Sequence, residues 1–315
     1  RLRTPALADL LRHIARQGSA AFYTGPSAEA LVAKVRQHAD NPGRLQSADL
    51  QAYRPVRREA LCQLWLQQYR VCGFPPPSSG QLTQMQILGL LEQLPALEQP
   101  LQDGRPSAAF LHRYSEAAKL AFADRAQYIA DPDFVPAPAG DWRSLLAADY
   151  LKQRAALIGA RSMGQAEHGV PGGRPLAWAP QAAQEEYGTS HLSIVDADGH
   201  AVAMTSSIEQ AFGARQLSDG GTGLPGGFLL NNQLTDFAFV PRDAAGHPVA
   251  NRVEPGKRPR SSVSPTLVFD AQSGALLASL GAPGGAAIIH FTAKTLLGLY
   301  AWQLDRSEER RVGKE

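Results

Sequence analysis

Tyr187-Gly188-Thr189-Ser190-His191-Leu192-Ser193-Ile194-Val195-Asp196 marks the point at which the sequence changes its period. Before this stretch apolar residues recur at helical spacing, and after it apolar and polar residues alternate as they do in strands. The expected fold is therefore α+β, with a helical first half and antiparallel strands after Thr189. The Gly188–Thr189 step also indicates chemistry, because an N-terminal threonine can be a nucleophile that uses its own α-amine as base. Since Thr189 is internal, this chemistry requires cleavage of the Gly188–Thr189 bond.

The first half contains several segments with helical periodicity. Helices are predicted over 5–17, 27–38, 47–53, 81–93, 108–129 and 143–158. The run Phe74-Pro75-Pro76-Pro77-Ser78-Ser79-Gly80 cannot be regular structure, because three prolines fix φ and remove three donors. Residues 160–186 are rich in Gly, Pro, Ala and Gln and lack periodicity. We expect them to form an exposed connector in which a processing site is accessible.

Two hairpins are predicted after Thr189. The first joins 192–195 to 201–205 through a turn with Asp-Gly chemistry. The second joins 265–269 to 275–280 and is followed by a helix over 286–304. Helices that precede an antiparallel core, with one more helix on the sheet, predict a layered α+β domain.

Composition excludes several classes of protein. The 315 residues are 44% hydrophobic and carry a formal net charge of +2, with basic and acidic residues interspersed, so no nucleic-acid surface is expected. No apolar run approaches the roughly 18–20 residues that span a bilayer. The two cysteines, Cys62 and Cys72, fit no metal-ligand pattern. One disulfide and two free thiols both remain open for them.

Separate segments of the chain resemble the gamma-glutamyltransferase family of N-terminal-nucleophile hydrolases, and they occur in family order up to about residue 304. They are Ala21-Phe22-Tyr23-Thr24-Gly25, Ser47-Ala48-Asp49-Leu50, Phe74-Pro75-Pro76-Pro77-Ser78-Ser79-Gly80, Ala121-Phe122-Ala123-Asp124-Arg125, Asp131-Pro132-Asp133-Phe134, Thr189-Ser190-His191, Leu229-Leu230-Asn231-Asn232-Gln233-Leu234-Thr235-Asp236-Phe237, Lys257-Arg258-Pro259-Arg260-Ser261-Ser262 and Gly281-Ala282-Pro283-Gly284-Gly285. The resemblance implies a four-layer αββα sandwich.

The resemblance also implies a division of the chain. Residues 1–188 would be the C-terminal part of a large subunit, and residues 189–305 the N-terminal part of a small subunit. The sandwich would be incomplete, because the chain is expected to be a fragment that lacks the start of the large subunit and the end of the small one. The charged run 306–315 is expected to lie outside the fold.

Four positions match the family's catalytic groups. The resemblance implies that Thr189 attacks the carbonyl of Gly188, and that hydrolysis of the resulting ester frees its amine. Ser207 matches the hydroxyl that hydrogen-bonds this amine, and serine keeps both donor and acceptor. Gly284 and Gly285 match the oxyanion hole, where the absence of a Cβ lets backbone N–H groups approach the tetrahedral intermediate.

Five further positions match the family's substrate contacts. Glu209 and Asp236 resemble the carboxylates that receive the α-amino group of a γ-glutamyl substrate, and Gln233 would contact the same region. Ser261 and Ser262 resemble the pair that hydrogen-bonds the substrate α-carboxylate. In the family a large-subunit arginine completes the carboxylate contact, and no segment here matches its motif.

The same residue types have structural interpretations that the sequence alone leaves open. Threonine favours the start of a strand, a serine pair can cap loop backbone, and a glycine pair can lead into a helix. Ser207 and Glu209 could each simply face solvent. His191 beside the nucleophile is expected to be structural, because the amine already serves as base.

The reaction that the resemblance implies is cleavage of γ-glutamyl amides such as glutathione through a γ-glutamyl ester of Thr189. The ester would pass to water or to an amino acid. The two subunits of one precursor would form a heterodimer, no metal or organic cofactor is implied, and the family favours a periplasmic or secreted location. Two alternatives remain: an acylase acting on glutaryl-type side chains or poly-γ-glutamate, and an inactive, unprocessed fragment.

Overall fold

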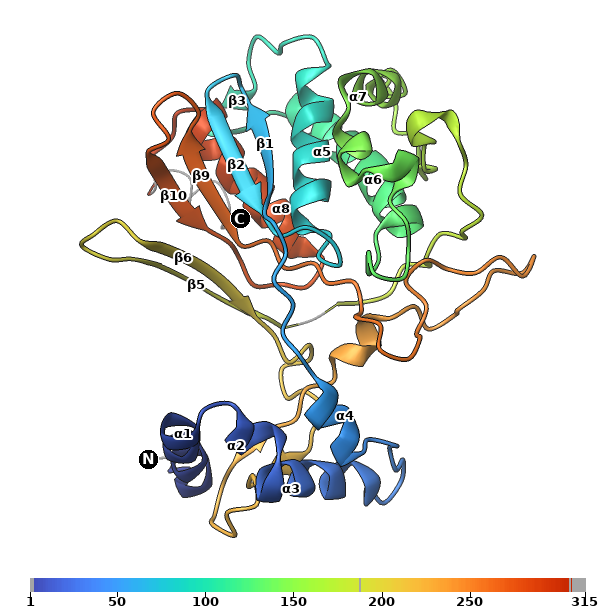
Figure 1. Ribbon diagram of the computed structural model, residues 1–315. Coiled ribbons are helices and arrows are strands. Elements are labelled where there is room, and N and C mark those ends of the chain that lie inside the picture. The colour runs from blue at the N-terminus through green and yellow to red at the C-terminus, as the bar shows by residue number, and fades with distance from the viewer. Residues whose placement is uncertain (1–2, 187, 306, 308–315) are drawn as a thin grey trace. The chain divides into compact units, whose positions relative to one another are not determined.

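A computed structural model describes residues 3–186, 188–305 and 307 (Figure 1). The chain divides into two compact units, one of residues 1–57 with 208–233 and the other of residues 58–207 with 234–315. Of the predicted tail 306–315, all but residue 307 lies outside the described residues. Among the helices of the described part, none is long and apolar enough to cross a membrane.

The first unit, in its described residues 3–57 and 208–233, contains four helices and a short hairpin. Its elements are α1 (Pro5–Gln17), α2 (Ala20–Tyr23), α3 (Gly25–Arg36), α4 (Ser47–Ala52), β7 (Leu217–Ser218) and β8 (Phe228–Leu229). The predicted helix over 5–17 is confirmed at both ends. Ala6 and Leu10 form its buried face, and the Ala6 N–H donates to the carbonyl of Pro225 at 3.2 Å. The two sequence segments of this unit, 1–57 and 208–233, are therefore joined by a backbone hydrogen bond.

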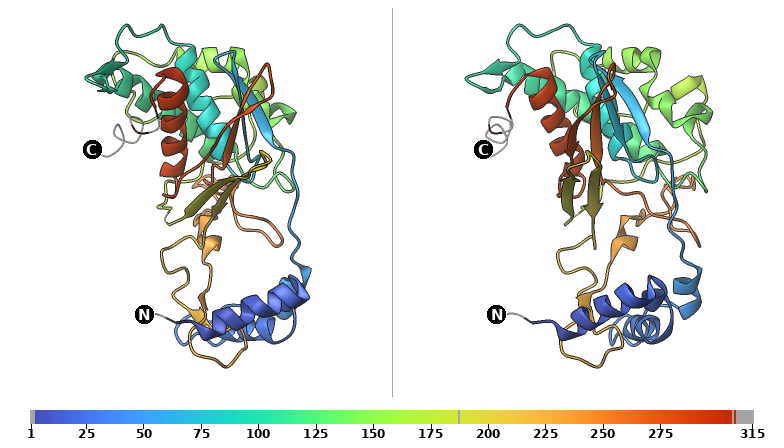
Figure 2. Two further views of the ribbon diagram at one scale, coloured as in Figure 1. Left: turned by 90° about the vertical axis from the view of Figure 1, so that its left-hand side faces the viewer. Right: turned by 60° about the vertical axis from the view of Figure 1, so that its left-hand side comes forward.

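The second unit is built on an antiparallel four-stranded sheet in the order β1-β2-β9-β10. The strands are β1 (Leu61–Trp65), β2 (Tyr69–Gly73), β9 (Thr266–Asp270) and β10 (Leu276–Leu280). Helices α5 (Gly80–Glu92) and α8 (Ala287–Leu296) cover one face of the sheet (Figure 2). Val71 and Val268, both fully buried, are paired neighbours in the core of the sheet. The predicted α+β class is thus confirmed.

Two further helices pack against α5. They are α6 (Ala108–Tyr128) and α7 (Ala148–Ala155), and the short hairpin of β3 (Leu101–Gln102) and β4 (Arg105–Pro106) precedes α6. The continuous helix predicted over 143–158 is wrong: a 3-10 turn, Trp142–Leu146, is separated from α7 by the extended residue Ala147. The helix predicted over 286–304 ends as an α-helix at Leu296 and continues as one π-helical turn.

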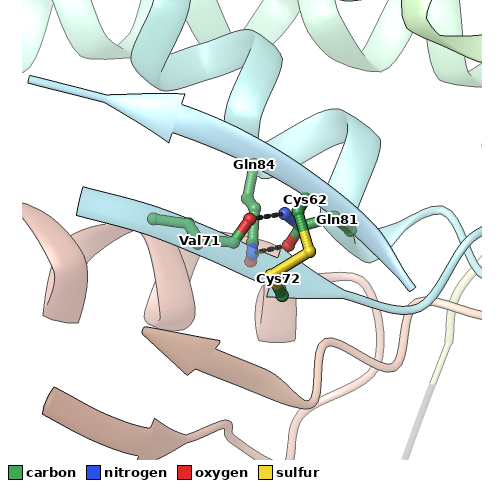
Figure 3. The surroundings of a disulfide bond; sticks show 5 residues. All are labelled: Cys62, Val71, Cys72, Gln81 and Gln84. Atoms are coloured by element: carbon green, nitrogen blue, oxygen red, sulfur yellow. Dashed lines mark hydrogen bonds between the residues drawn. A yellow bond between two sulfur atoms is a disulfide. The ribbon is translucent and has the colours of Figure 1, made fainter. Parts of the chain in front are cut away.

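The β1–β2 hairpin is cross-linked by a disulfide between Cys62 and Cys72 (Figure 3). The two cysteines lie directly opposite each other in the antiparallel register. Beside them the Gln81 side chain from α5 donates to the carbonyl of Val71 at 2.8 Å. The alternative of two free thiols is therefore not what the structure shows.

A second hairpin, β5 (Ser190–Val195) with β6 (Ala201–Ser206), confirms the strand pair predicted around the Asp-Gly turn. It lies beside β10, where the Ser279 hydroxyl donates to the carbonyl of Val202 at 3.1 Å. Its apolar side chains remain exposed: Leu192, Ile194, Val195, Val202 and Met204. This hairpin places the residues on either side of it, Thr189 and Ser207, next to each other.

Candidate active site

Thr189 and Ser207 flank the β5–β6 hairpin and meet because Ser190 and Ser206 are paired in its register. The Thr189 hydroxyl donates to the Ser207 hydroxyl at 3.5 Å, and the Ser207 hydroxyl donates to the carbonyl of Gly188 at 2.8 Å. The predicted nucleophile, its hydroxyl neighbour and the predicted scissile carbonyl thus lie together. This arrangement polarises the carbonyl that Thr189 would attack.

The Pro-rich loop before α5 pairs with the segment that contains the predicted serine pair. The Ser79 N–H donates to the carbonyl of Ser261 at 2.8 Å, and the Ser261 N–H donates to Pro77 at 3.2 Å. Gly80 is required for this approach, since a Cβ there would lie 2.5 Å from the carbonyl oxygen of Val263. Ser261 is therefore fixed through its backbone, and the hydroxyl of its neighbour Ser262 is presented to α6.

Arg125 from α6 is the centre of a cluster of hydrogen bonds that includes the Ser262 side chain. Its Nε donates to the Ser79 hydroxyl at 2.8 Å, and its Nη2 donates to the Ser262 hydroxyl at 2.5 Å. Nη2 also donates to Glu186 Oε1 at 2.7 Å. The Ser262 hydroxyl in turn donates to Glu186 Oε2. We call these four residues, Ser79, Arg125, Glu186 and Ser262, the Arg125 cluster.

The charges in and around the Arg125 cluster favour an ionised carboxylate. Burial alone would raise the pKa of Glu186, but the positive charges of Arg125 and Arg260, with hydrogen bonds from Ser262 and Arg125, lower it overall. Burial and the charge of Arg125 lower the pKa of Arg260, whose Nη1 donates to the Arg125 carbonyl at 3.1 Å. Two guanidinium groups thus stabilise the negative charge of Glu186.

The predicted oxyanion pair, Gly284 and Gly285, leads directly into α8. Their φ angles of 126° and 56° are ones that L-residues rarely adopt. A Cβ at Gly285 would lie 2.2 Å from the carbonyl oxygen of Glu186, so the two backbones are in close contact. Glu186, which precedes the predicted cleavage site, therefore lies against Gly285, whereas Gly284 lies next to Phe291.

Asp236, predicted to bind the substrate amine, is buried at the end of a 3-10 turn, Gln233–Asp236. The Asn251 side chain donates to its carbonyl at 2.7 Å, which fixes the backbone of the turn. The charge of Asp236 raises the pKa of Arg260 against the larger effect of burial. Arg260 therefore interacts electrostatically both with Asp236 and with the Arg125 cluster.

Glu209 and Gln233 belong to the first unit. Glu209 is 4% exposed and accepts a hydrogen bond from the Asn232 side chain at 2.5 Å, so the alternative that it faces solvent is wrong. The Gln233 N–H donates to the Asn231 side chain at 2.5 Å. Substrate contact by these two residues stays a prediction.

His191 has hydrogen-bonding neighbours that fit a structural role. Its Nδ1 lies 2.8 Å from the Thr205 hydroxyl, and its Nε2 lies 3.1 Å from the Ser193 hydroxyl. Burial lowers its pKa, which favours the neutral ring at physiological pH.

Sequence reasoning missed the roles of Arg125, Glu186 and Ser79. Arg125 stands in a quoted family segment, and Glu186 lies three residues before Thr189. The signal in the sequence that could have indicated a role for Glu186 was its position so close to the predicted cleavage site. Its partners, however, are 61 and 76 positions away in the chain.

The fold is that of the N-terminal-nucleophile hydrolases. A cephalosporin acylase from Bacillus halodurans superposes with a TM-score of 0.73 at 24% identity, over 96% of this chain and 48% of that one. Sequence comparison then defines the family. Residues 1–309 match the Gamma-glutamyltranspeptidase family, so the chain belongs to it.

Two curated relatives show how much of a family member is present. A glutathione hydrolase proenzyme from Pseudomonas aeruginosa is 35% identical, over 95% of this chain and 50% of its own length. A glutathione hydrolase proenzyme from Escherichia coli (strain K12) is 36% identical, over 90% of this chain and 45% of its own length. The chain thus spans about half the length of the curated relatives that it matches.

Proposed function

We propose that this chain carries the self-cleavage and acyl-transfer centre of an enzyme that hydrolyses or transfers the γ-glutamyl group of glutathione-like amides. The observation that carries the proposal is the position of the Ser207 hydroxyl, which hydrogen-bonds both the Thr189 hydroxyl and the Gly188 carbonyl. One hydroxyl thus hydrogen-bonds both the proposed nucleophile and the carbonyl that it would attack, before any bond is broken. The names of the relatives supply the proposed substrate class.

In the proposed self-cleavage, Thr189 Oγ adds to the carbonyl carbon of Gly188 and loses its proton. The Ser207 hydroxyl, 2.8 Å from the carbonyl oxygen, stabilises the negative charge that forms there. Collapse breaks the peptide C–N bond, and the proton that Oγ released is transferred to the nitrogen of Thr189, which becomes an amine. Water then hydrolyses the ester between Gly188 and Thr189, which leaves a free N-terminal threonine.

In the proposed turnover, the same hydroxyl attacks the γ-carbonyl of a substrate, with the freed amine as base. Gly284 and Gly285 would stabilise the oxyanion, and Ser261 and Ser262 would bind the substrate α-carboxylate. Glu209, Gln233 and Asp236 would bind its α-amine. Water or the amine of an amino acid would release the γ-glutamyl group from Thr189.

Denaturing electrophoresis with mass spectrometry of the purified chain tests self-cleavage. We expect products that correspond to residues 1–188 and 189–315, and one intact chain for Thr189→Ala. Ser190→Ala, which removes the adjacent exposed hydroxyl, is the matched control and should cleave normally. An intact wild-type chain without activity on a γ-glutamyl anilide would support the inert alternative instead.

The acylase alternative differs in its need for the substrate amine, and the name of the similar solved structure is the reason to keep it. Glu209→Gln and Asp236→Asn, measured on a γ-glutamyl anilide, separate the two functions. A γ-glutamyl enzyme should lose roughly 10–100-fold in kcat/KM, because a charge-assisted hydrogen bond contributes about 1.5–3 kcal/mol. Unchanged KM in both variants would favour the acylase.

A further inference from the structure

Glu186 and Arg125 form a buried ion pair across a long separation in sequence. Their side chains are only 12% and 7% exposed, although 61 positions separate them in the chain. Burial of two charges is unfavourable unless the geometry is good and further hydrogen bonds satisfy the remaining atoms. Here Arg125 also donates to the hydroxyls of Ser79 and Ser262.

Both carboxylate oxygens of Glu186 are used in this cluster. Oε1 accepts from Arg125 and Oε2 accepts from Ser262. A guanidinium and a hydroxyl that together bind both oxygens form a general recognition site for a carboxylate. The ligand of this site is thus a side chain that belongs to the segment just before the cleavage site.

The backbone of Glu186 lies against Gly285, which the proposed reaction requires as part of the oxyanion hole. Its carbonyl group lies so close to Gly285 that a Cβ there would be 2.2 Å from the oxygen and 2.5 Å from the carbon. Two residues earlier, the Gln184 side chain donates to the carbonyl of Thr235 at 2.7 Å. Glu186 is therefore fixed against both Gly285 and Ser262, and Gln184 anchors the segment two residues earlier.

We propose that Glu186 is an internal carboxylate ligand that fills the site formed by Arg125 and Ser262 in the uncleaved chain and excludes a substrate carboxylate from it. The proposal rests on the proposed function, because it takes Ser262 as the residue that a substrate would use. Cleavage after Gly188 would make Glu186 the third residue from a new chain end. The tether to Thr189 is then lost, so the segment is held from its N-terminal side alone, and the effective concentration of the internal carboxylate falls.

The two carboxylates would thus compete for Ser262, and self-cleavage would decide the competition. Before cleavage the internal ligand is held on both sides by covalent chain. Afterwards its segment is free to leave, and a soluble carboxylate can enter. The alternative is a purely structural ion pair that stays in place after cleavage.

Binding of L-glutamate to chains that cannot self-cleave tests the proposal. Calorimetry would compare Thr189→Ala, Thr189→Ala with Glu186→Ala, and Thr189→Ala with the matched control Glu185→Ala at the neighbouring exposed residue. We expect at least a tenfold gain in affinity only with Glu186→Ala, and loss of that gain when Arg125→Met is added. A folded Glu186→Ala chain that binds no better than Thr189→Ala would overturn the proposal.

Hydrogen exchange provides a second measurement that needs no substitution at Glu186. The segment before Gly188 should be protected in the Thr189→Ala chain and lose at least about tenfold in protection in the self-cleaved wild type. Equal protection in both would overturn the proposal, whether or not the Glu186→Ala chain folds. The Cys62–Cys72 hairpin should show equal protection in both samples and serves as the internal control.

Glutarate, which has two carboxylates and no amine, separates this proposal from the proposed function. If glutarate and L-glutamate both gain affinity and bind equally, the internal ligand is supported and recognition of the amine is not. If L-glutamate binds more tightly, both are supported. If neither gains affinity, the internal ligand is rejected, while the cleavage and turnover experiments still decide the proposed function.

Discussion

Asp124 and Arg125 are consecutive residues of α6, and each is the centre of a buried polar cluster, but the two clusters hold different kinds of partner. Asp124 accepts hydrogen bonds from Gln86 of α5, from Tyr150 and Arg154 of α7, and from the backbone of Gly169. We call these five residues the Asp124 cluster. Three of the four groups that donate to Asp124 are side chains on helices that pack against α6, and the fourth is the backbone N–H of Gly169.

The Arg125 cluster instead joins α6 to loops. Ser79 lies in the Pro-rich loop, Ser262 lies in the segment that pairs with this loop, and Glu186 precedes the predicted cleavage site. Cleavage after Gly188 would therefore leave the Asp124 cluster intact and release one partner of the Arg125 cluster. One helix thus contributes a fixed scaffold at one residue and a ligand-exchange site at the next.

The largest expected effect is on the scaffold. Asp124→Ala leaves Arg154, only 5% exposed, without its buried partner, so the chain should lose about 3–5 kcal/mol of unfolding free energy. Urea unfolding of the Thr189→Ala chain measures this loss. Asp149→Ala, at the exposed first turn of α7, is the matched control and should cost less than about 1 kcal/mol. Equal losses in the two variants would contradict a special role for the Asp124 cluster.

The second effect is smaller and should depend on cleavage. Arg125→Met removes charged hydrogen bonds to Ser79, Ser262 and Glu186, and should cost about 2–3 kcal/mol in the uncleaved chain. In the self-cleaved chain, from which Glu186 can leave, the cost should be lower. Urea unfolding of both forms checks this difference, with Arg143→Met at a largely exposed side chain as control. An identical cost in both forms would mean that Glu186 stays in place.

Local elements were predictable because their signals are local. The helix over 5–17 and the β5–β6 hairpin follow from periodicity and turn chemistry, and both agree with the structure to within two residues. The break at Ala147 was missed, because helical spacing of apolar residues continues across one extended residue. Apolar spacing therefore predicts which face of a segment is buried better than it predicts whether the segment is continuous.

The candidate site was predictable only in part. Hairpin register brings Thr189 and Ser207 together, and that register could be inferred from the turn. The pairing of Arg125 with Glu186 and Ser262 could not, because it spans 61 and 137 positions and depends on how α6 packs against two loops. Burial of Glu209 was likewise undecided, since its partner Asn232 is 23 positions away.

Acid should weaken the Arg125 cluster through Glu186. Because the pKa of Glu186 is lowered in the folded chain, its carboxylate contributes stability that is present above its unfolded pKa of about 4.3. This contribution is lost as the pH falls through the lower pKa of the folded chain. Urea unfolding between pH 7 and pH 3 should show the difference between Thr189→Ala and Thr189→Ala with Glu186→Gln shrinking in acid. Glu185→Gln is the control, and a difference independent of pH would contradict the assignment.

The smallest effect should distinguish the two neighbouring serines. Ser262→Ala removes the hydroxyl between Arg125 and Glu186 and should cost about 1 kcal/mol in the uncleaved chain, because the direct ion pair remains. Ser261→Ala should cost less, since Ser261 is held through its backbone by Ser79 and Pro77. Urea unfolding in the Thr189→Ala background compares them. A larger loss for Ser261→Ala would show that the wrong hydroxyl has been assigned to the carboxylate, and the internal-ligand proposal would then lose its second hydrogen bond.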